Sequence, residues 1–108
     1  MRTLTIVAAL MLWAGVAEGG ENWMSGNELL DYCEAKNGDR MLCLGFVVGV
    51  DQGAVTQGGH LCVSSKATYG QMADIVSKYL QEHPERRHTD AARLVITALQ
   101  KAFPCPKK

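Results

Sequence analysis

The sequence predicts an all-α fold, a compact four-helix bundle-like domain held by two disulfides. Three observations predict it: four stretches with helical signals and short connections, no convincing strand alternation, and four cysteines in a chain of 108 residues. Hydrophobic residues make up 47% of the chain, and 11 Lys+Arg residues balance 11 Asp+Glu residues. This length and composition predict one small globular domain.

The charge balance limits the classes of partner. A formal net charge of zero and a pI near 6.8 provide no broad basic field, either for nucleic acid or for an anionic membrane surface. Aromatic residues are only 6% of the chain, so a stacking surface for single strands is not expected. We therefore expect no nucleic-acid partner.

The amino terminus has the features of a signal peptide. Arg2 precedes an apolar run over residues 4–16, and Gly15 and Ala17 are small residues where a signal peptidase reads them. The run is shorter than the roughly 20 residues that span a bilayer, which argues against an anchor. We predict cleavage of residues 1–17, an exported domain over residues 18–108, and no membrane association after cleavage.

The first helix and its turn carry clear end signals. Ser25 and Glu28 stand at the spacing of a capping box, so a helix is expected over about residues 26–36. In the following Asn37-Gly38-Asp39, Gly38 suits a left-handed helix exit and Asp39 suits the next N-cap. The second helix is then expected to begin near Arg40.

The apolar segment over residues 41–50 is consistent with a buried strand or with a central helix, and periodicity alone does not separate them. Gly45, Gly49 and Gly53 favour the helix, because their spacing places all three on one helical face. Such a face packs closely, either against another helix of the chain or against a second copy. Glycines in residues 57–59 end the segment.

Two amphipathic helices follow. Thr68 and Gln71 form a second capping box, and Pro84 ends the helix they begin. The last helix is expected over residues 90–102, with Thr89 or Asp90 as its cap. The expected core positions are Tyr69, Met72, Ile75, Val76, Tyr79 and Leu80 in the third helix, and Ala91, Leu94, Val95, Ala98, Leu99 and Ala102 in the fourth.

The four cysteines predict two structural disulfides. Cys33, Cys43, Cys62 and Cys105 all follow the predicted signal peptide, and they form no Cys-x-x-Cys motif for redox chemistry or zinc. Cys33 lies at the end of one helix and Cys43 at the start of the next, so antiparallel packing favours pairing Cys33 with Cys43 and Cys62 with Cys105. Cys33–Cys105 with Cys43–Cys62 is the alternative.

The densest polar segment lies between the last two helices. Pro84 interrupts any regular ligand spacing, so a metal site is not expected, and the segment is either a solvated connection or an exposed partner-binding loop. We find no nucleophile, base or phosphate-binding motif in the chain and expect neither an enzyme nor a bound cofactor. The candidate partner-binding residues are Glu82, His83, Glu85, Arg86, Arg87 and His88.

An ordered set of motifs resembles the Rap/Tai immunity protein family. The set is Gly26-Asn27-Glu28-Leu29-Leu30 through Cys33, Cys43-Leu44-Gly45-Phe46-Val47-Val48-Gly49-Val50-Asp51, Cys62, Tyr79-Leu80 with His83-Pro84, and Phe103-Pro104-Cys105-Pro106. The resemblance implies a periplasmic, helical, disulfide-bonded protein that neutralises a peptidoglycan amidase effector of type VI secretion. It also implies a homodimer, and a loop near residues 82–88 that enters the amidase cleft.

A different class of function is the alternative. Small size, disulfides and three histidines, which gain charge as the pH falls, are also typical of a periplasmic chaperone or envelope-stress protein. A specific enzyme partner would favour the immunity function, whereas binding of many unrelated envelope proteins would favour the chaperone.

Overall fold

The computed structural model describes residues 23–107, and the predicted signal peptide over residues 1–17 lies outside them. The described chain forms four α-helices and one 3-10 turn and contains no strand, only an isolated bridge between Ser25 and Asp90. The predicted all-α fold is confirmed. The elements are α1 (Gly26–Glu34), α2 (Arg40–Thr56), α3 (Tyr69–Glu82), η1 (Pro84–Arg86) and α4 (Ala91–Ala102).

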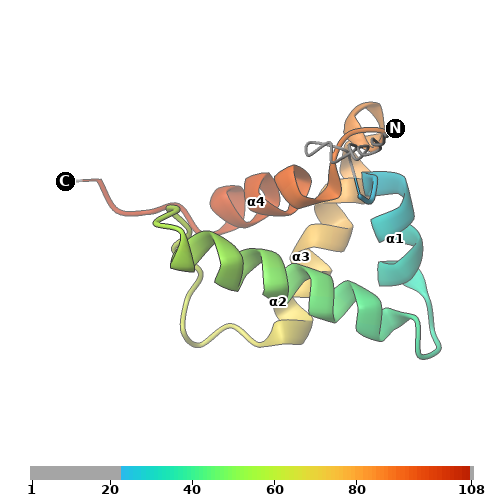
Figure 1. Cartoon of the computed structure of the whole chain (residues 1–108), viewed down its shortest axis with the longest axis horizontal. Helices are drawn as coiled ribbons and strands as arrows, with labels where there is room; N and C mark the ends of the chain where they lie inside the picture. Colours follow the sequence, from blue (N-terminus) through green and yellow to red (C-terminus); the bar gives the residue numbers. More distant parts are fainter. Residues whose placement is uncertain (1–22, 108) are drawn as a thin grey trace, which may run out of the picture.

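The helices pack around α3. In Figure 1, α2 runs along the front of the molecule and α3 crosses behind it, and the two helices contact each other. The short α1 packs against both, and α4 packs mainly on α3. The connection from α3 to α4 therefore lies at the same end of the molecule as the start of α1 (Figure 1).

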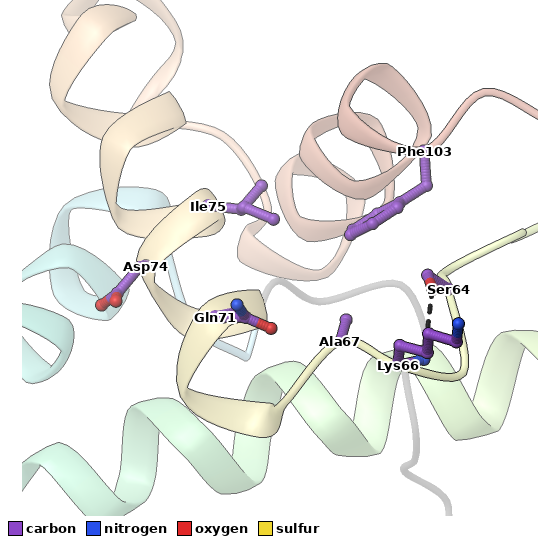
Figure 2. A pocket seen from close by; sticks show the side chains of 7 residues that line it. All are labelled: Ser64, Lys66, Ala67, Gln71, Asp74, Ile75 and Phe103. Carbon is purple, nitrogen blue, oxygen red and sulfur yellow. Dashed lines mark hydrogen bonds between the residues drawn. The ribbon is translucent and has the colours of Figure 1, made fainter.

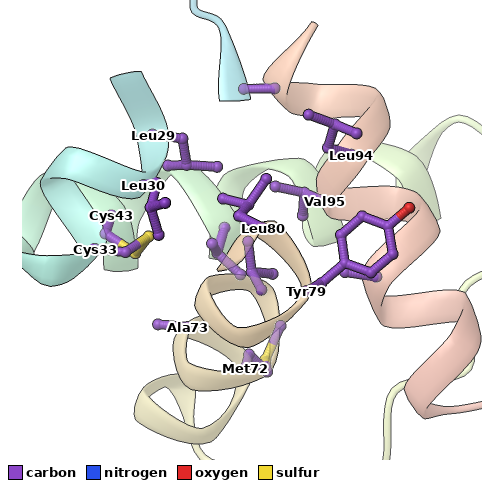
Figure 3. Close-up of a cluster of buried hydrophobic side chains, with 14 of the residues drawn as sticks. Leu29, Leu30, Cys33, Cys43, Met72, Ala73, Tyr79, Leu80, Leu94 and Val95 are labelled. Carbon is purple, nitrogen blue, oxygen red and sulfur yellow. A yellow bond between two sulfur atoms is a disulfide. The ribbon is translucent and has the colours of Figure 1, made fainter. Parts of the chain in front are cut away.

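The core forms where these helices meet. Figure 3 shows leucine, valine and methionine side chains from all four helices converging beside the Cys33–Cys43 disulfide. Burial of each large apolar side chain contributes roughly 1.5–3 kcal/mol. The core consists of Leu29, Leu30, Cys33, Cys43, Val47, Met72, Ala73, Val76, Tyr79, Leu80, Ala91, Leu94, Val95, Ala98 and Leu99.

Both predicted capping boxes are present. The Ser25 hydroxyl accepts from the Glu28 amide at 3.2 Å, and the Glu28 carboxylate accepts from the Ser25 amide at 2.9 Å. Thr68 and Gln71 make the same pair of hydrogen bonds at the start of α3, at 3.0 and 2.8 Å. Each box pairs amide groups that the first turn of a helix leaves unbonded.

The turn between α1 and α2 differs from the prediction. The first helix ends at Glu34 rather than near Lys36, and Gly38 does not adopt the predicted left-handed conformation. Asp39 stands at the N-cap position, but its side chain makes no capping hydrogen bond. The Asn37 side chain instead accepts from the Asp39 amide at 2.9 Å, forming the turn that the prediction gave to Gly38 and Asp39.

The segment over residues 41–50 is helical, as the glycine spacing favoured, and α2 ends in a glycine motif. Gly58 has a positive φ of 79°, its amide donates to Val55, and the Gly59 amide donates to Ala54 at 2.6 Å. These two hydrogen bonds form a Schellman motif. The left-handed residue thus stands after α2, where a side chain would strain the backbone.

The glycine stripe of α2 does not pack inside the chain. A Cβ added at Gly45, Gly49 or Gly53 would meet no atom within 4 Å among the described residues. The interpretation of intramolecular packing is therefore wrong for residues 23–107, and a contact with a second copy stays a prediction. Two expected core positions are also wrong: Tyr69 is 64% exposed and Ala102 is exposed, and each is the terminal residue of its helix.

The preferred disulfide pairing is confirmed. Cys33 bonds to Cys43 and Cys62 bonds to Cys105, with Cα atoms 4.9 and 5.2 Å apart. The first disulfide is buried in the core, whereas Cys62 is exposed on the second. The second disulfide links the connection after α2 to the tail after α4.

Candidate functional site: the α3–α4 loop

The predicted partner-binding segment forms a structured connection, the α3–α4 loop (residues 83–90). Pro84 cannot continue α3, and it begins the short η1 turn. Inside the loop, the Arg86 amide donates to the His83 carbonyl at 2.9 Å, and the Thr89 hydroxyl donates to the Arg86 carbonyl at 2.7 Å. The loop therefore has its own hydrogen-bonded backbone shape.

Main-chain hydrogen bonds fix the loop against the start of α1. The Gly26 amide donates to the Thr89 carbonyl at 3.0 Å, and the Asn27 amide donates to the Arg87 carbonyl at 2.8 Å. The Ala91 amide donates to the Met24 carbonyl at 2.9 Å. Together with the capping box, the first two of these bonds pair the amides of the N-cap Ser25 and of the first three residues of α1, so the loop completes the helix end that supports it.

The close approach requires a glycine at position 26. A Cβ at Gly26 would lie 2.5 Å from a methyl carbon of Leu94 and 3.0 Å from the Arg87 carbonyl oxygen. Both distances are shorter than a normal contact, so a side chain here would force the Leu94 side chain to move and the Arg87 backbone to shift by a few tenths of an ångström. Sequence reasoning missed this role, because the Ser25–Glu28 box accounted for the segment without it.

Four of the six predicted contact residues lie on the surface. Glu82, Glu85, Arg86 and His88 are exposed, whereas His83 and Arg87 are half-buried. Glu82, the last residue of α3, lies 4.0 Å from the Lys78 ammonium one turn earlier.

His83 and Glu85 hold each other beside Tyr79. The His83 ring lies 4.2 Å from the Tyr79 ring, and its Nδ1 lies 3.1 Å from a carboxylate oxygen of Glu85. The pKa of Glu85 is lowered below its ordinary value of 4.5, first by a hydrogen bond from its own backbone amide and then by the bond with His83. These contacts fold the Glu85 carboxylate back toward the loop.

The two arginines of the loop have different surroundings. Arg86 is exposed, and one of its guanidinium nitrogens donates to the Tyr79 hydroxyl at 3.4 Å. Arg87 donates to the Leu80 carbonyl at 3.4 Å, and its Nε is buried without a hydrogen-bond partner in the described structure. Arg86 is therefore available to a partner, whereas Arg87 joins the loop to the end of α3.

A second surface is the outer face of α2, made of Met41, Leu42, Gly45, Val48, Gly49 and Val55. Met41 is 66% exposed, and Leu42 and Val55 are each 51% exposed. The charged residues of α2 are Arg40 and Asp51, and both are turned at least partly inward. The outer face therefore carries no charged side chain. Tyr69 borders it on one side, and Trp23, stacked on Phe46 with ring centroids 6.4 Å apart, borders it on the other.

The pocket in Figure 2 lies apart from both surfaces. It has a volume of about 490 Å³, and none of the predicted contact residues lines it. Ala67, Ile75 and Phe103 give it an apolar wall, while Asp74 at its rim is paired with Arg40 at 3.2 Å. It contains no arrangement of nucleophile and base that would indicate catalysis.

The chain matches the family described as Rap1a immunity proteins over residues 25–105. It is a member of this family. The match begins at the N-cap of α1 and ends at the last cysteine, so it includes the α3–α4 loop and both disulfides. As a Rap1a family member, the chain is an immunity protein against a secreted effector. Its two disulfides are those of an extracytoplasmic protein.

No curated protein and no solved structure matches the chain. Within residues 23–107, no three His, Cys, Asp or Glu side chains gather closely enough to hold a metal ion. In the same range, no helix has the length and apolar character needed to cross a bilayer.

Proposed function

We propose that this Rap1a family member is a periplasmic immunity protein that binds a peptidoglycan amidase effector of type VI secretion and occludes its cleft. Residues 1–17 would direct its export, and inhibition would need neither a cofactor nor catalysis by this chain. The observation that carries the proposal is the family match, which includes the α3–α4 loop. Main-chain hydrogen bonds hold this loop in place, and Glu85, Arg86 and His88 are exposed on it.

The rigid loop suits this mechanism physically. A loop already held in its bound shape loses little conformational entropy on association, so more of the contact energy contributes to affinity. Its exposed charges also accelerate and orient the encounter with a complementary cleft. A loop that fills the cleft excludes substrate without any chemical step.

The test first asks whether an exported Cys-His amidase is encoded beside this protein, and then measures inhibition of that amidase. The wild-type chain without residues 1–17, with both disulfides formed, should inhibit the amidase at a one-to-one ratio. Arg86→Glu reverses an exposed charge and should weaken binding by at least about tenfold. Lys36→Glu is the matched control, because Lys36 is exposed beyond the other end of α1.

Two outcomes would contradict the proposal. Binding to many unrelated envelope proteins, without one stoichiometric enzyme, would favour the chaperone alternative. If Arg86→Glu binds the amidase as tightly as the wild type, the loop is not part of the interface. Arg87→Glu is unsuitable as a probe, since it would place a carboxylate where the half-buried guanidinium now joins the loop to α3.

The homodimer belongs to the same proposal, and the outer face of α2 is the surface we assign to it. Each glycine in a helix interior costs about 1 kcal/mol relative to alanine. Gly45, Gly49 and Gly53 meet no neighbour in the described chain that would offset this cost. A second α2 lying across the glycines would offset it and would cover the exposed Met41 and Leu42.

Sedimentation analysis of Gly49→Arg tests the dimer. In the single chain a side chain at Gly49 meets open space, so the variant should stay folded while its dimer dissociates at least about tenfold more readily. Gly38→Arg is the control, because Gly38 also has no neighbour within 4 Å but lies in the α1–α2 turn. If the wild-type protein is still monomeric at about 100 µM, its dimer is weaker than most specific complexes, and this part of the proposal is contradicted.

A further inference from the structure

A groove runs from the α3–α4 loop onto the outer side of α4. It has a volume of about 750 Å³ and is lined by Arg86, Thr89, Arg93, Leu94, Ile96 and Thr97. Half-buried Ile96 and the 4% of Leu94 that is exposed supply a small aliphatic surface, the threonines supply hydroxyls, and the two arginines supply positive charge. The groove extends the exposed surface of the loop over the first two turns of α4.

Neither guanidinium at the groove forms an ion pair within residues 23–107, and Arg86 interacts with a carboxylate only through its weaker charge effect on the pKa of the neighbouring Glu85. No acidic residue of the described chain lines the groove. Glu85, next to Arg86 in the sequence, is bonded to His83 at 3.1 Å. Arg86 uses one N–H group on the Tyr79 hydroxyl, which leaves its other donors for a ligand.

We propose that this groove binds an acidic segment of the effector, with a carboxylate between Arg86 and Arg93 and an adjoining aliphatic side chain against Leu94 and Ile96. The inference rests on the proposed function, because it names the chemistry of the partner at the same interface. Guanidinium groups bind carboxylates through two parallel hydrogen bonds, which fixes orientation as well as adding affinity.

This site would also select the effector. A basic segment at this position would repel the two guanidinium groups, and a neutral segment would leave them without a carboxylate partner. The loop would then provide occlusion, while the groove on α4 would distinguish one effector from another.

The first test compares effector affinity across changes at Arg93, which is exposed and makes no hydrogen bond within the described chain. Arg93→Gln should weaken binding about tenfold at 50 mM salt, and the difference should disappear at 1 M salt. Arg93→Lys should retain part of the affinity, because it keeps the charge but loses the planar fork. Lys36→Gln is the control for loss of one positive charge.

An unchanged affinity of Arg93→Gln would overturn the groove inference. If Arg86→Glu still weakens binding in that case, the proposed function stands. The groove inference can therefore be wrong while the proposed immunity function is right, and the two variants distinguish these cases.

A second test needs no effector. The probe is the blocked peptide Ac-Glu-Leu-Glu-NH2, added to isotope-labelled protein and followed by amide chemical shifts. The shifts should concentrate at Thr89, Arg93 and Thr97, disappear in Arg93→Gln, and be absent with Ac-Gln-Leu-Gln-NH2. Equal shifts with both peptides, or shifts spread over other surfaces, would overturn the inference.

Discussion

The α2–α3 loop (residues 57–68) and the α3–α4 loop (residues 83–90) are held in place by different means. The first is linked at Cys62 to the tail after α4, its Leu61, Val63 and Ala67 side chains pack against the core, and its main-chain hydrogen bonds are local. The second contains no cysteine, and main-chain hydrogen bonds hold it on the start of α1. One loop is held by a disulfide and by apolar side chains, and the other by hydrogen bonds along its backbone.

The difference shows which kind of support positions side chains precisely. A disulfide stabilises mainly by restricting the unfolded chain, so it does not by itself determine the path of the neighbouring backbone. Backbone hydrogen bonds require donor and acceptor to stand about 3 Å apart, so they determine the path of the loop. The loop that exposes Arg86 is the one held by main-chain hydrogen bonds, and a recognition surface requires such fixed positions.

The largest expected effect comes from removing the covalent link. Cys62→Ser combined with Cys105→Ser should lower the free energy of unfolding by roughly 4 kcal/mol, because the unfolded chain loses closure of a loop with a sequence separation of 43. Urea denaturation measures the loss. Hydrogen exchange should accelerate more in the α2–α3 loop than at Gly26 and Asn27, beyond the acceleration that the lower global stability causes at every amide. An equal acceleration in both regions would show that the two loops are not held independently.

The next effect comes from disturbing the α3–α4 loop. Gly26→Ala places a Cβ against Leu94 and Arg87 and should cost about 1–3 kcal/mol by overpacking. It should also weaken effector binding without touching the effector. Gly38→Ala is the control, since its Cβ meets nothing and its φ is not positive; it should be neutral or slightly stabilising. Equal stability of the two variants in thermal unfolding would show that the loop does not depend on Gly26.

The two capping boxes allow a matched comparison. Ser25→Ala and Thr68→Ala should each cost about 1 kcal/mol, since each removes one hydrogen bond to a helix amide. Only Ser25→Ala should also speed exchange at the Gly26 and Asn27 amides, because only α1 receives the α3–α4 loop. Urea denaturation with hydrogen exchange separates the two effects. Similar exchange in both variants would show that the loop is independent of the cap.

The smallest effect is the titration of Glu85. Its pKa is lowered in the folded protein, so its ionised form stabilises the fold above pH 4.5, and this contribution is lost as the pH falls through the lowered value. Carboxyl NMR should detect a titration below 4.5. In His83→Ala the pKa should rise only part of the way, since the backbone hydrogen bond remains. An unchanged value in that variant would exclude His83 as a cause.

Much of the fold could be predicted because its signals are local. Capping boxes, an amphipathic stripe and the position of Pro84 each depend on neighbouring residues, and all of them appear in the structure. The order of the helices favoured the observed disulfide pairing but left Cys33–Cys105 with Cys43–Cys62 open as the alternative. Gly38 was misjudged because Asn37, an equally local turn former, supplied the turn with its side chain.

The candidate site was predictable as a segment but not as a surface. Residues 82–88 stood out by charge, yet the sequence could not separate exposed Arg86 from half-buried Arg87, since that depends on how the loop meets α1 and α3. Arg93 was missed because it reaches the groove only through the docking of α4 beside the loop. Gly26 was missed for the same reason, a contact between segments far apart in the chain.

The Cys62–Cys105 bond closes a covalent ring around α3, the α3–α4 loop and α4. A protease that cuts the exposed loop after Arg86 would open the main chain inside this ring. The two fragments would remain one covalent molecule until a reductant acts, and the core contacts of both helices would still hold them together. The protein would therefore survive a single cleavage in this loop as a nicked but assembled domain.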